Sequence, residues 1–235
     1  MKKYKYVVVI GCSFSVTDNM EEYGYTVSNR LGAKYYNLAE SGHSIQYMYR
    51  SLLQWCSKNM DKFEDTLIIL GVTSVSRYEI WSNKLKNWHR IHGDHIESYY
   101  DDLFGRDEQN NVMEHRMSRD SLRKHFMNFY NKNAQFYLAT SYIVGMQSFL
   151  KLNNIDHLFF DALEPIDTYY EDEFGYREIF DNLVSHENWY KHPEYKSMID
   201  FTLKNPEMRV SKEDEHPNKK AHGYWAKCLL EYINE

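Results

Sequence analysis

The sequence predicts an α/β protein with a mainly parallel sheet and helices on both faces. Four apolar runs are typical of strands, near residues 5–10, 34–37, 66–70 and 156–161. Four stretches with apolar residues three and four positions apart are typical of amphipathic helices, near 21–31, 44–59, 132–152 and 219–233. Strands that alternate with helices favour parallel pairing, because each crossover helix then covers a face of the sheet.

The composition indicates one enzyme-sized domain. The chain has 235 residues, 43% of them hydrophobic, which is enough for one sizeable core. Its net charge of -6 is not offset by a basic tail or patch, so no nucleic-acid partner is expected. Only four strongly apolar residues precede Gly11, too few for a signal peptide or a membrane span. We therefore expect a cytoplasmic protein with no membrane partner.

The cysteines and histidines do not indicate a metal site. Cys12, Cys56 and Cys228 have no close pair, which fits a reducing compartment and excludes a disulfide framework or a Cys-based zinc site. Three histidines recur at intervals of three in Trp88–His95, but Gly93 interrupts that segment, and a solvated loop is the better interpretation. No metal or organic cofactor is expected.

The first strand carries the candidate nucleophile. Four β-branched residues, 7–10, lead through Gly11 and Cys12 to Ser13. Open α/β sheets place their sites at the carboxyl ends of strands, and a serine in that position can act as a nucleophile. Neighbouring side chains of a strand-turn point to opposite sides, so we expect Cys12 to be packed and unreactive.

The end of the chain supplies the other two parts of a serine hydrolase. Glu213 and Asp214 stand shortly before His216, and an apolar helical stripe follows. An imidazole can take the proton of the serine, and a carboxylate can orient that imidazole and stabilise its charged form. Three-residue spacing selects Glu213, whereas residue type favours Asp214 slightly, and both stay open. His222 is expected on the surface of the last helix.

With these residues in view, the sequence resembles the SGNH (GDSL-type) hydrolases, and the divergent blocks are closest in kind to intracellular and viral members. Residues 37–44 resemble the second block of that family, and Gly71-Val72-Thr73-Ser74 stands where its third block does. Cys12 occupies the usual place of an aspartate. The resemblance implies a flavodoxin-like three-layer fold. The periodicity fades near 77–131 and 163–208, so we expect two long insertions there, at the top edge of the sheet, or lids.

The same resemblance implies an oxyanion hole, a group of donors that stabilises the tetrahedral intermediate. Its members would be the backbone N–H groups of Ser13 and Gly42, with Thr73 in the position of an asparagine. Ser74 and Arg77 are further candidates to help Thr73. Arg77 and His43 are also candidate substrate-binding residues.

The implied function is that of a serine esterase or acyl-group hydrolase with a Ser-His-Asp/Glu triad and no cofactor. A small ester or an acetylated sugar-like substrate is favoured over a lipid, because the sequence shows no amphipathic membrane segment. Cys12 and Thr73 support one alternative, a non-catalytic binding or assembly protein on the same fold. An acyltransferase that uses the same serine is a second alternative, and the oligomeric state stays open.

Overall fold

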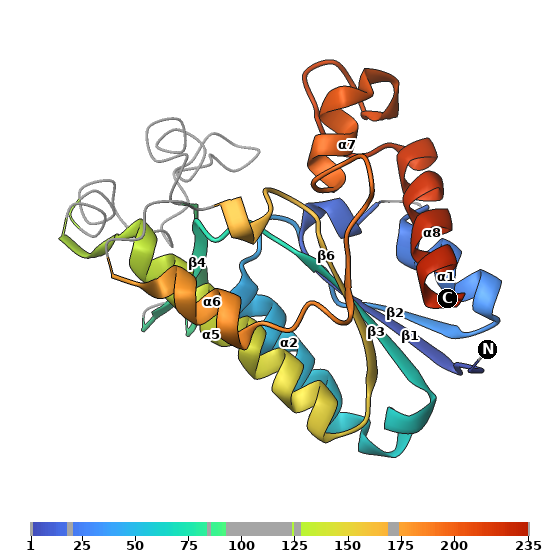
Figure 1. Cartoon of the computed structure of the whole chain (residues 1–235), viewed down its shortest axis with the longest axis horizontal. Helices are drawn as coiled ribbons and strands as arrows, with labels where there is room; N and C mark the ends of the chain where they lie inside the picture. Colours follow the sequence, from blue (N-terminus) through green and yellow to red (C-terminus); the bar gives the residue numbers. More distant parts are fainter. Residues whose placement is uncertain are drawn as a thin grey trace.

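The computed structural model describes residues 2–17, 21–83, 86–92, 124, 128–168 and 174–234. Within them lie a five-stranded sheet and a separate two-stranded hairpin (Figure 1). The strands of the sheet are β1 (Tyr6–Ile10), β2 (Lys34–Asn37), β3 (Thr66–Val72), β6 (Asp156–Asp161) and β7 (Trp189–Tyr190). The hairpin pairs β4 (Arg77–Ser82) with β5 (Asn87–His92).

The order of the strands decides where a site can form. It is β2-β1-β3-β6-β7, with every neighbouring pair parallel. This is the flavodoxin-like order, and it confirms the predicted fold class. β1 lies between β2 and β3, so the chain first crosses to one side of β1 and then to the other. The crevice at the carboxyl ends of β1 and β3 is the switch point where such sheets bind ligands.

Helices cover both faces of the sheet (Figure 1). One face carries α2 (Ile45–Lys58), α5 (Lys132–Leu152) and α6 (Tyr176–Leu183), and the other carries α1 (Tyr23–Leu31) and α8 (Lys219–Asn234). α7 (Met198–Lys204) adds Met198 and Phe201 to the core on the α8 side.

The alternation of side chains along β1 explains why its sequence is apolar throughout. Val8 and Ile10 lie in the core beneath α2 and α5, whereas Val7 and Val9 lie in the core beneath α1 and α8. A strand with both faces buried needs an unbroken apolar run. Cys12 is also fully buried in the second core, which confirms that it is packed.

The four predicted strands and four predicted helices are all present. The hairpin, β7, α6 and α7 were not predicted and lie in the segments where periodicity fades. His89 and His92 belong to strand β5, so the prediction of a loop there was wrong, and His95 lies outside the described residues. The surface position predicted for His222 was also wrong, since its side chain is fully buried between α8 and α1.

In the described part of the chain, no helix has the length and apolar character needed to cross a membrane.

Candidate active site

Ser13 begins a short 3-10 turn, Ser13–Ser15, directly after β1. The Ser15 N–H donates to Cys12 O at 2.9 Å, and the Asn37 amide on β2 donates to Ser15 O at 2.9 Å. The turn needs glycine at position 11, because a Cβ there would lie 2.4 Å from the Ser15 hydroxyl oxygen. These contacts hold the candidate nucleophile at the switch point of the sheet.

The loop before α8 brings His216 to the same place. The Val210 N–H donates to His216 O at 2.9 Å, and the Asn218 N–H donates to Met208 O at 2.9 Å. The Asn218 side chain accepts from Ala221 N at 3.1 Å and so begins α8. Backbone pairing on one side and the helix cap on the other therefore fix the loop that carries the histidine.

Ser13, His216 and Asp214 form a chain of contacts. Ser13 Oγ lies 2.8 Å from His216 Nε2, and His216 Nδ1 lies 2.5 Å from Asp214 Oδ1. The ring of Phe14 packs against the imidazole, with centroids 5.1 Å apart. The side chain of His216 is 44% exposed, so solvent and small molecules can reach it.

The two candidate carboxylates differ in what they contact. Asp214 Oδ1 also accepts the backbone N–H of His216 at 3.0 Å, whereas Glu213 contacts Ser211 Oγ at 3.3 Å. The backbone hydrogen bond from His216 and then its side chain lower the pKa of Asp214 below the usual value. Asp214 therefore stays ionised at neutral pH, as the partner of an imidazolium must.

The turn that contains Gly42 is tied to the strand that carries Ser13. Leu38 N–H donates to Val9 O at 2.8 Å, and Glu40 N–H donates to Gly11 O at 3.3 Å. Gly42 itself has a φ of 75°, a left-handed conformation that glycine adopts without strain. The backbones of Glu40 and Gly11 are thus hydrogen-bonded to each other, which joins the Gly42 turn to the residues that precede Ser13.

Thr73 follows β3, next to β1, and its side chain is buried. Its hydroxyl oxygen accepts from Arg77 Nη1 at 3.1 Å. Ser74 Oγ lies 2.9 Å from Ser76 Oγ. A cavity of about 230 Å³ lies beside Arg77, between β4, α2 and α5.

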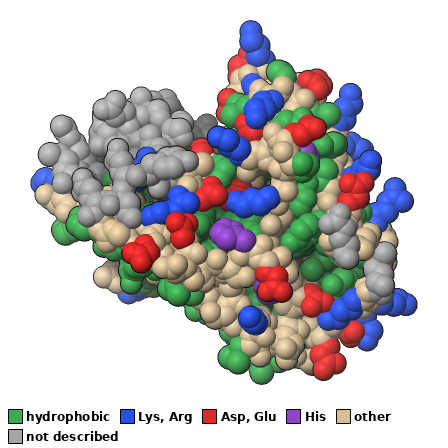
Figure 2. All heavy atoms as spheres, in the orientation of Figure 1, with side chains coloured by type: hydrophobic (Ala, Val, Ile, Leu, Met, Phe, Trp, Pro, Cys, Tyr) green, Lys and Arg blue, Asp and Glu red, His purple; other side chains and the backbone are tan. Residues whose placement is uncertain are grey.

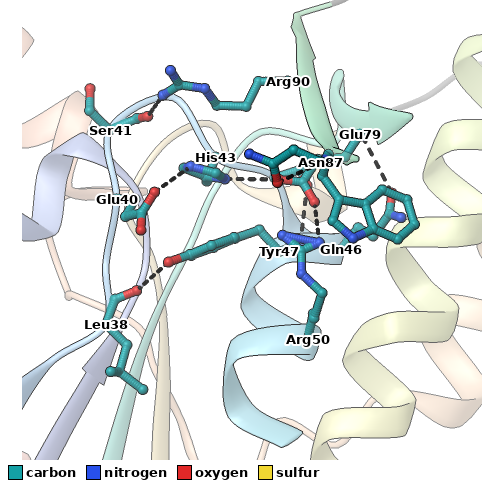
Figure 3. Close-up of polar contacts among 12 residues, drawn as sticks. Leu38, Glu40, Ser41, His43, Gln46, Tyr47, Arg50, Glu79, Asn87 and Arg90 are labelled. Carbon is teal, nitrogen blue, oxygen red and sulfur yellow. Dashed lines mark hydrogen bonds and ion pairs between the residues drawn. The ribbon is translucent and has the colours of Figure 1, made fainter. Parts of the chain in front are cut away.

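His43 has a setting that the sequence did not indicate. Its Nδ1 lies 2.8 Å from Glu79 Oε1 on β4, and its Nε2 lies 2.7 Å from Glu40 Oε2 (Figure 3). Glu79 also accepts from Arg50 Nη1 on α2 at 2.8 Å. Nothing in the sequence signalled Glu79, because the strand β4 was itself not predicted, and nothing paired it with Arg50 on the predicted helix.

Across the described ranges, no group of three or more His, Cys, Asp or Glu side chains is arranged to hold a metal ion. On the face that Figure 2 shows, basic and acidic side chains of the described residues are interspersed. Ser13, His216 and Asp214 have the contacts that activation of a serine by a histidine and a carboxylate requires.

No protein-family model matches the sequence, and neither does any curated protein sequence. Solved structures do match. Esterase EstA from Pseudoalteromonas sp. aligns with 98% of this chain and 97% of its own, at 11% identity and a TM-score of 0.52. The structure titled TesA aligns with 97% of each chain, at 13% identity and a TM-score of 0.50. A lipolytic protein of the G-D-S-L family from Veillonella parvula aligns with 98% of each chain, at 13% identity and a TM-score of 0.44. The first two matches show that the chain has the α/β fold of EstA and TesA.

Proposed function

We propose that this protein is a serine ester hydrolase with Ser13 as nucleophile, His216 as general base and acid, and Asp214 as the group that orients His216. One observation carries the proposal. Ser13 Oγ, both nitrogens of His216 and the Asp214 carboxylate are linked by contacts of 2.8 and 2.5 Å. The three side chains come from two loops that are 201 residues or more apart in the sequence, and these contacts join them beside the carboxyl end of β1.

In the first half of the reaction, Ser13 Oγ attacks the ester carbonyl carbon while its proton passes to His216 Nε2. Asp214 stabilises the imidazolium that forms. The tetrahedral intermediate then collapses, the ester bond breaks, and the leaving alcohol takes the proton from His216. A water molecule repeats these steps on the acyl-serine and releases the carboxylic acid.

The oxyanion would be held by the N–H groups of Ser13 and Gly42 and by the hydroxyl of Thr73. The contact with Arg77 supports the third donor. Because Thr73 Oγ1 accepts from Arg77, its single hydrogen points elsewhere and is available to another acceptor. Arg77 then acts on the substrate through Thr73. The cavity beside Arg77 also gives its guanidinium room to contact a polar group of the substrate directly.

The substrate class that we propose is a small ester, such as an acetylated sugar-like molecule. His216 and Asp214 have side chains that are 44% and 46% exposed, which leaves room for a bulky polar alcohol part of the ester. Hydrolysis of p-nitrophenyl acetate, butyrate and decanoate tests this directly. The kcat/KM should fall as the acyl chain lengthens, and a preference for decanoate would contradict the proposed class.

Reaction with a fluorophosphonate probe followed by peptide mapping tests the nucleophile without knowledge of the substrate. The label should appear on Ser13 in the wild type and be absent in Ser13→Ala. Cys12→Ala is the matched control. It alters the fully buried side chain next to Ser13, and Ser13 should still take the label in this variant. The Ser13→Ala variant should also lose p-nitrophenyl acetate hydrolysis while its thermal unfolding stays cooperative.

An unlabelled Ser13 in folded wild-type protein would favour the alternative of a non-catalytic binding protein on this fold. A label that persists in Ser13→Ala and disappears in Cys12→Ala would move the nucleophile to the thiol. Either result would overturn the proposed triad.

A further inference from the structure

The oxyanion donor proposed at Gly42 belongs to the peptide group that joins Ser41 to Gly42. This peptide lies in the turn between β2 and α2 and is not cis. A trans peptide is planar, so its N–H and its C=O point in opposite directions. Any group that holds the Ser41 carbonyl therefore also sets the direction of the Gly42 N–H.

Arg90, on β5, holds that carbonyl. Its Nη1 donates to Ser41 O, and Figure 3 shows the side chain reaching over the turn from the hairpin. A hydrogen bond to the carbonyl also polarises the peptide, which makes the N–H on the other side a stronger donor. Because Arg90 is exposed, a change at this position should not disturb the core.

His43, which follows Gly42 in the turn, contacts the same hairpin. His43 Nδ1 contacts Glu79 on β4, and its Nε2 contacts Glu40. The side chain of Glu79 is wholly buried, and its other oxygen accepts from Arg50. The imidazole also packs on the ring of Tyr47, with centroids 3.9 Å apart. The residues on either side of Gly42 are thus held by adjacent strands of one hairpin.

These contacts do more to fix geometry than to add stability. The cost of removing charges from water offsets much of the attraction within a buried ion pair, so such a pair is weak support for a fold. It does require its members to stay in place, because a separated buried charge is costly. Catalytic donors need this property, since they must be oriented before the charge develops.

We propose that the β4–β5 hairpin is the positioning device of the oxyanion hole, with Arg90 and Glu79 aiming the Gly42 N–H. The inference rests on the proposed function, since it requires an oxyanion. Arg90 and His43 act here as positioning residues of the donor, through the peptide backbone.

Steady-state kinetics with p-nitrophenyl acetate test the role of Arg90. Arg90→Met keeps most of the aliphatic stem and removes the hydrogen-bond donor, and it should lower kcat by about tenfold, which is less than the 10²–10³ loss seen when an oxyanion donor itself is removed. KM should stay within about twofold, because the donor acts on the transition state. Arg90→Lys, which restores a cationic donor, should recover part of the loss. Arg177→Met is the matched control, since Arg177 donates to a backbone carbonyl, Asp167 O, on another element.

A spectroscopic measurement reports on the peptide itself. Ser41–Gly42 is the one Ser-Gly pair in the sequence, so labelling serine with ¹³C at the carbonyl and glycine with ¹⁵N selects this single amide. When Ser13 is phosphonylated, the proton signal of the Gly42 amide should move downfield in the wild type and in Arg177→Met. In Arg90→Met the movement should fall by half or more. A role confined to stability would leave this shift unchanged.

The outcomes separate the inference from the proposed function. Wild-type protein that neither hydrolyses the ester nor takes the phosphonate at Ser13 overturns both. Active wild type whose Ser41–Gly42 signal does not move on phosphonylation overturns the inference alone. The same holds if Arg90→Met keeps the wild-type kcat, or if Arg177→Met loses as much activity.

Discussion

Two buried groups should make the stability of this protein respond to acid in opposite directions. His222 is fully buried, and its Nδ1 accepts the backbone N–H of Tyr23 at 3.3 Å. Burial lowers the pKa of His222 from 6.5 to about 4. Asp161, at the carboxyl end of β6, contacts Lys191 and Trp189, and burial raises its pKa from 3.8 to about 6.

The two shifts have opposite signs in the free energy of unfolding. For His222, the unfolded chain takes up a proton near pH 6.5 and the folded protein only near pH 4, so stability is lost as the pH falls through this window. For Asp161, the folded protein takes up the proton first, so stability is gained as the pH falls from about 6 towards 3.8. At about 1.4 kcal/mol for each tenfold change in proton affinity, each effect is worth roughly 2–3 kcal/mol at pH 4.5.

Urea denaturation at pH 7.0 and pH 4.5 separates the two effects. In Asp161→Asn, the free energy of unfolding should fall about 2 kcal/mol further than in the wild type between these pH values. In His222→Gln, whose side-chain carbonyl can still accept from Tyr23, it should fall about 2–3 kcal/mol less than in the wild type. The other ionisable groups are common to all three proteins and cancel in the comparison. Parallel pH dependences in the three proteins would refute the reasoning.

Two further changes test the proposed machinery. Thr73→Val removes the hydroxyl and keeps the shape, and it should lower kcat by roughly ten- to a thousandfold with little change in KM; Thr73→Ser should retain most of the activity, and equal kinetics in all three proteins would remove Thr73 from the oxyanion hole. Asp214→Asn should lower kcat by up to roughly 10⁴-fold in the same assay, because the histidine loses its orienting carboxylate. Glu213→Gln should leave kcat near the wild-type value, and the reverse ranking would make Glu213 the acid.

The parts of the fold that the sequence predicted are those with a strong local pattern. β1 was predictable because both of its faces are buried, which leaves only apolar residues at 7–10. The helix α8 was predictable because one stripe of it packs on the sheet. Ser13, His216 and the acidic residues before it were predicted as site residues from their chemistry, since few residue types can activate a serine.

The hairpin could not be predicted because its burial does not alternate. In β4, Tyr78 and Glu79 are both buried although they are neighbours, so the period of two that marks a half-buried strand is missing. The contact of His43 with Glu79 was invisible for the same reason. His222 escaped because its partner, the Tyr23 N–H at the start of α1, lies 199 residues away. The charged residues near His222 in the sequence gave no sign that this side of α8 is buried.

The sequence departs from the pattern of the SGNH hydrolases that it resembles at two positions, and both weigh less against the proposed catalysis than the sequence suggested. Cys12, which replaces an aspartate, is fully buried in the core, and its side chain has no part in the proposed chemistry. Thr73, which replaces an asparagine, is shorter than an amide but is held by a guanidinium that occupies its acceptor site. A neighbouring positive charge also makes a hydroxyl a better donor to a developing oxyanion. The Arg77–Thr73 contact therefore supports the proposed hydrolase over a binding protein that has lost its third donor.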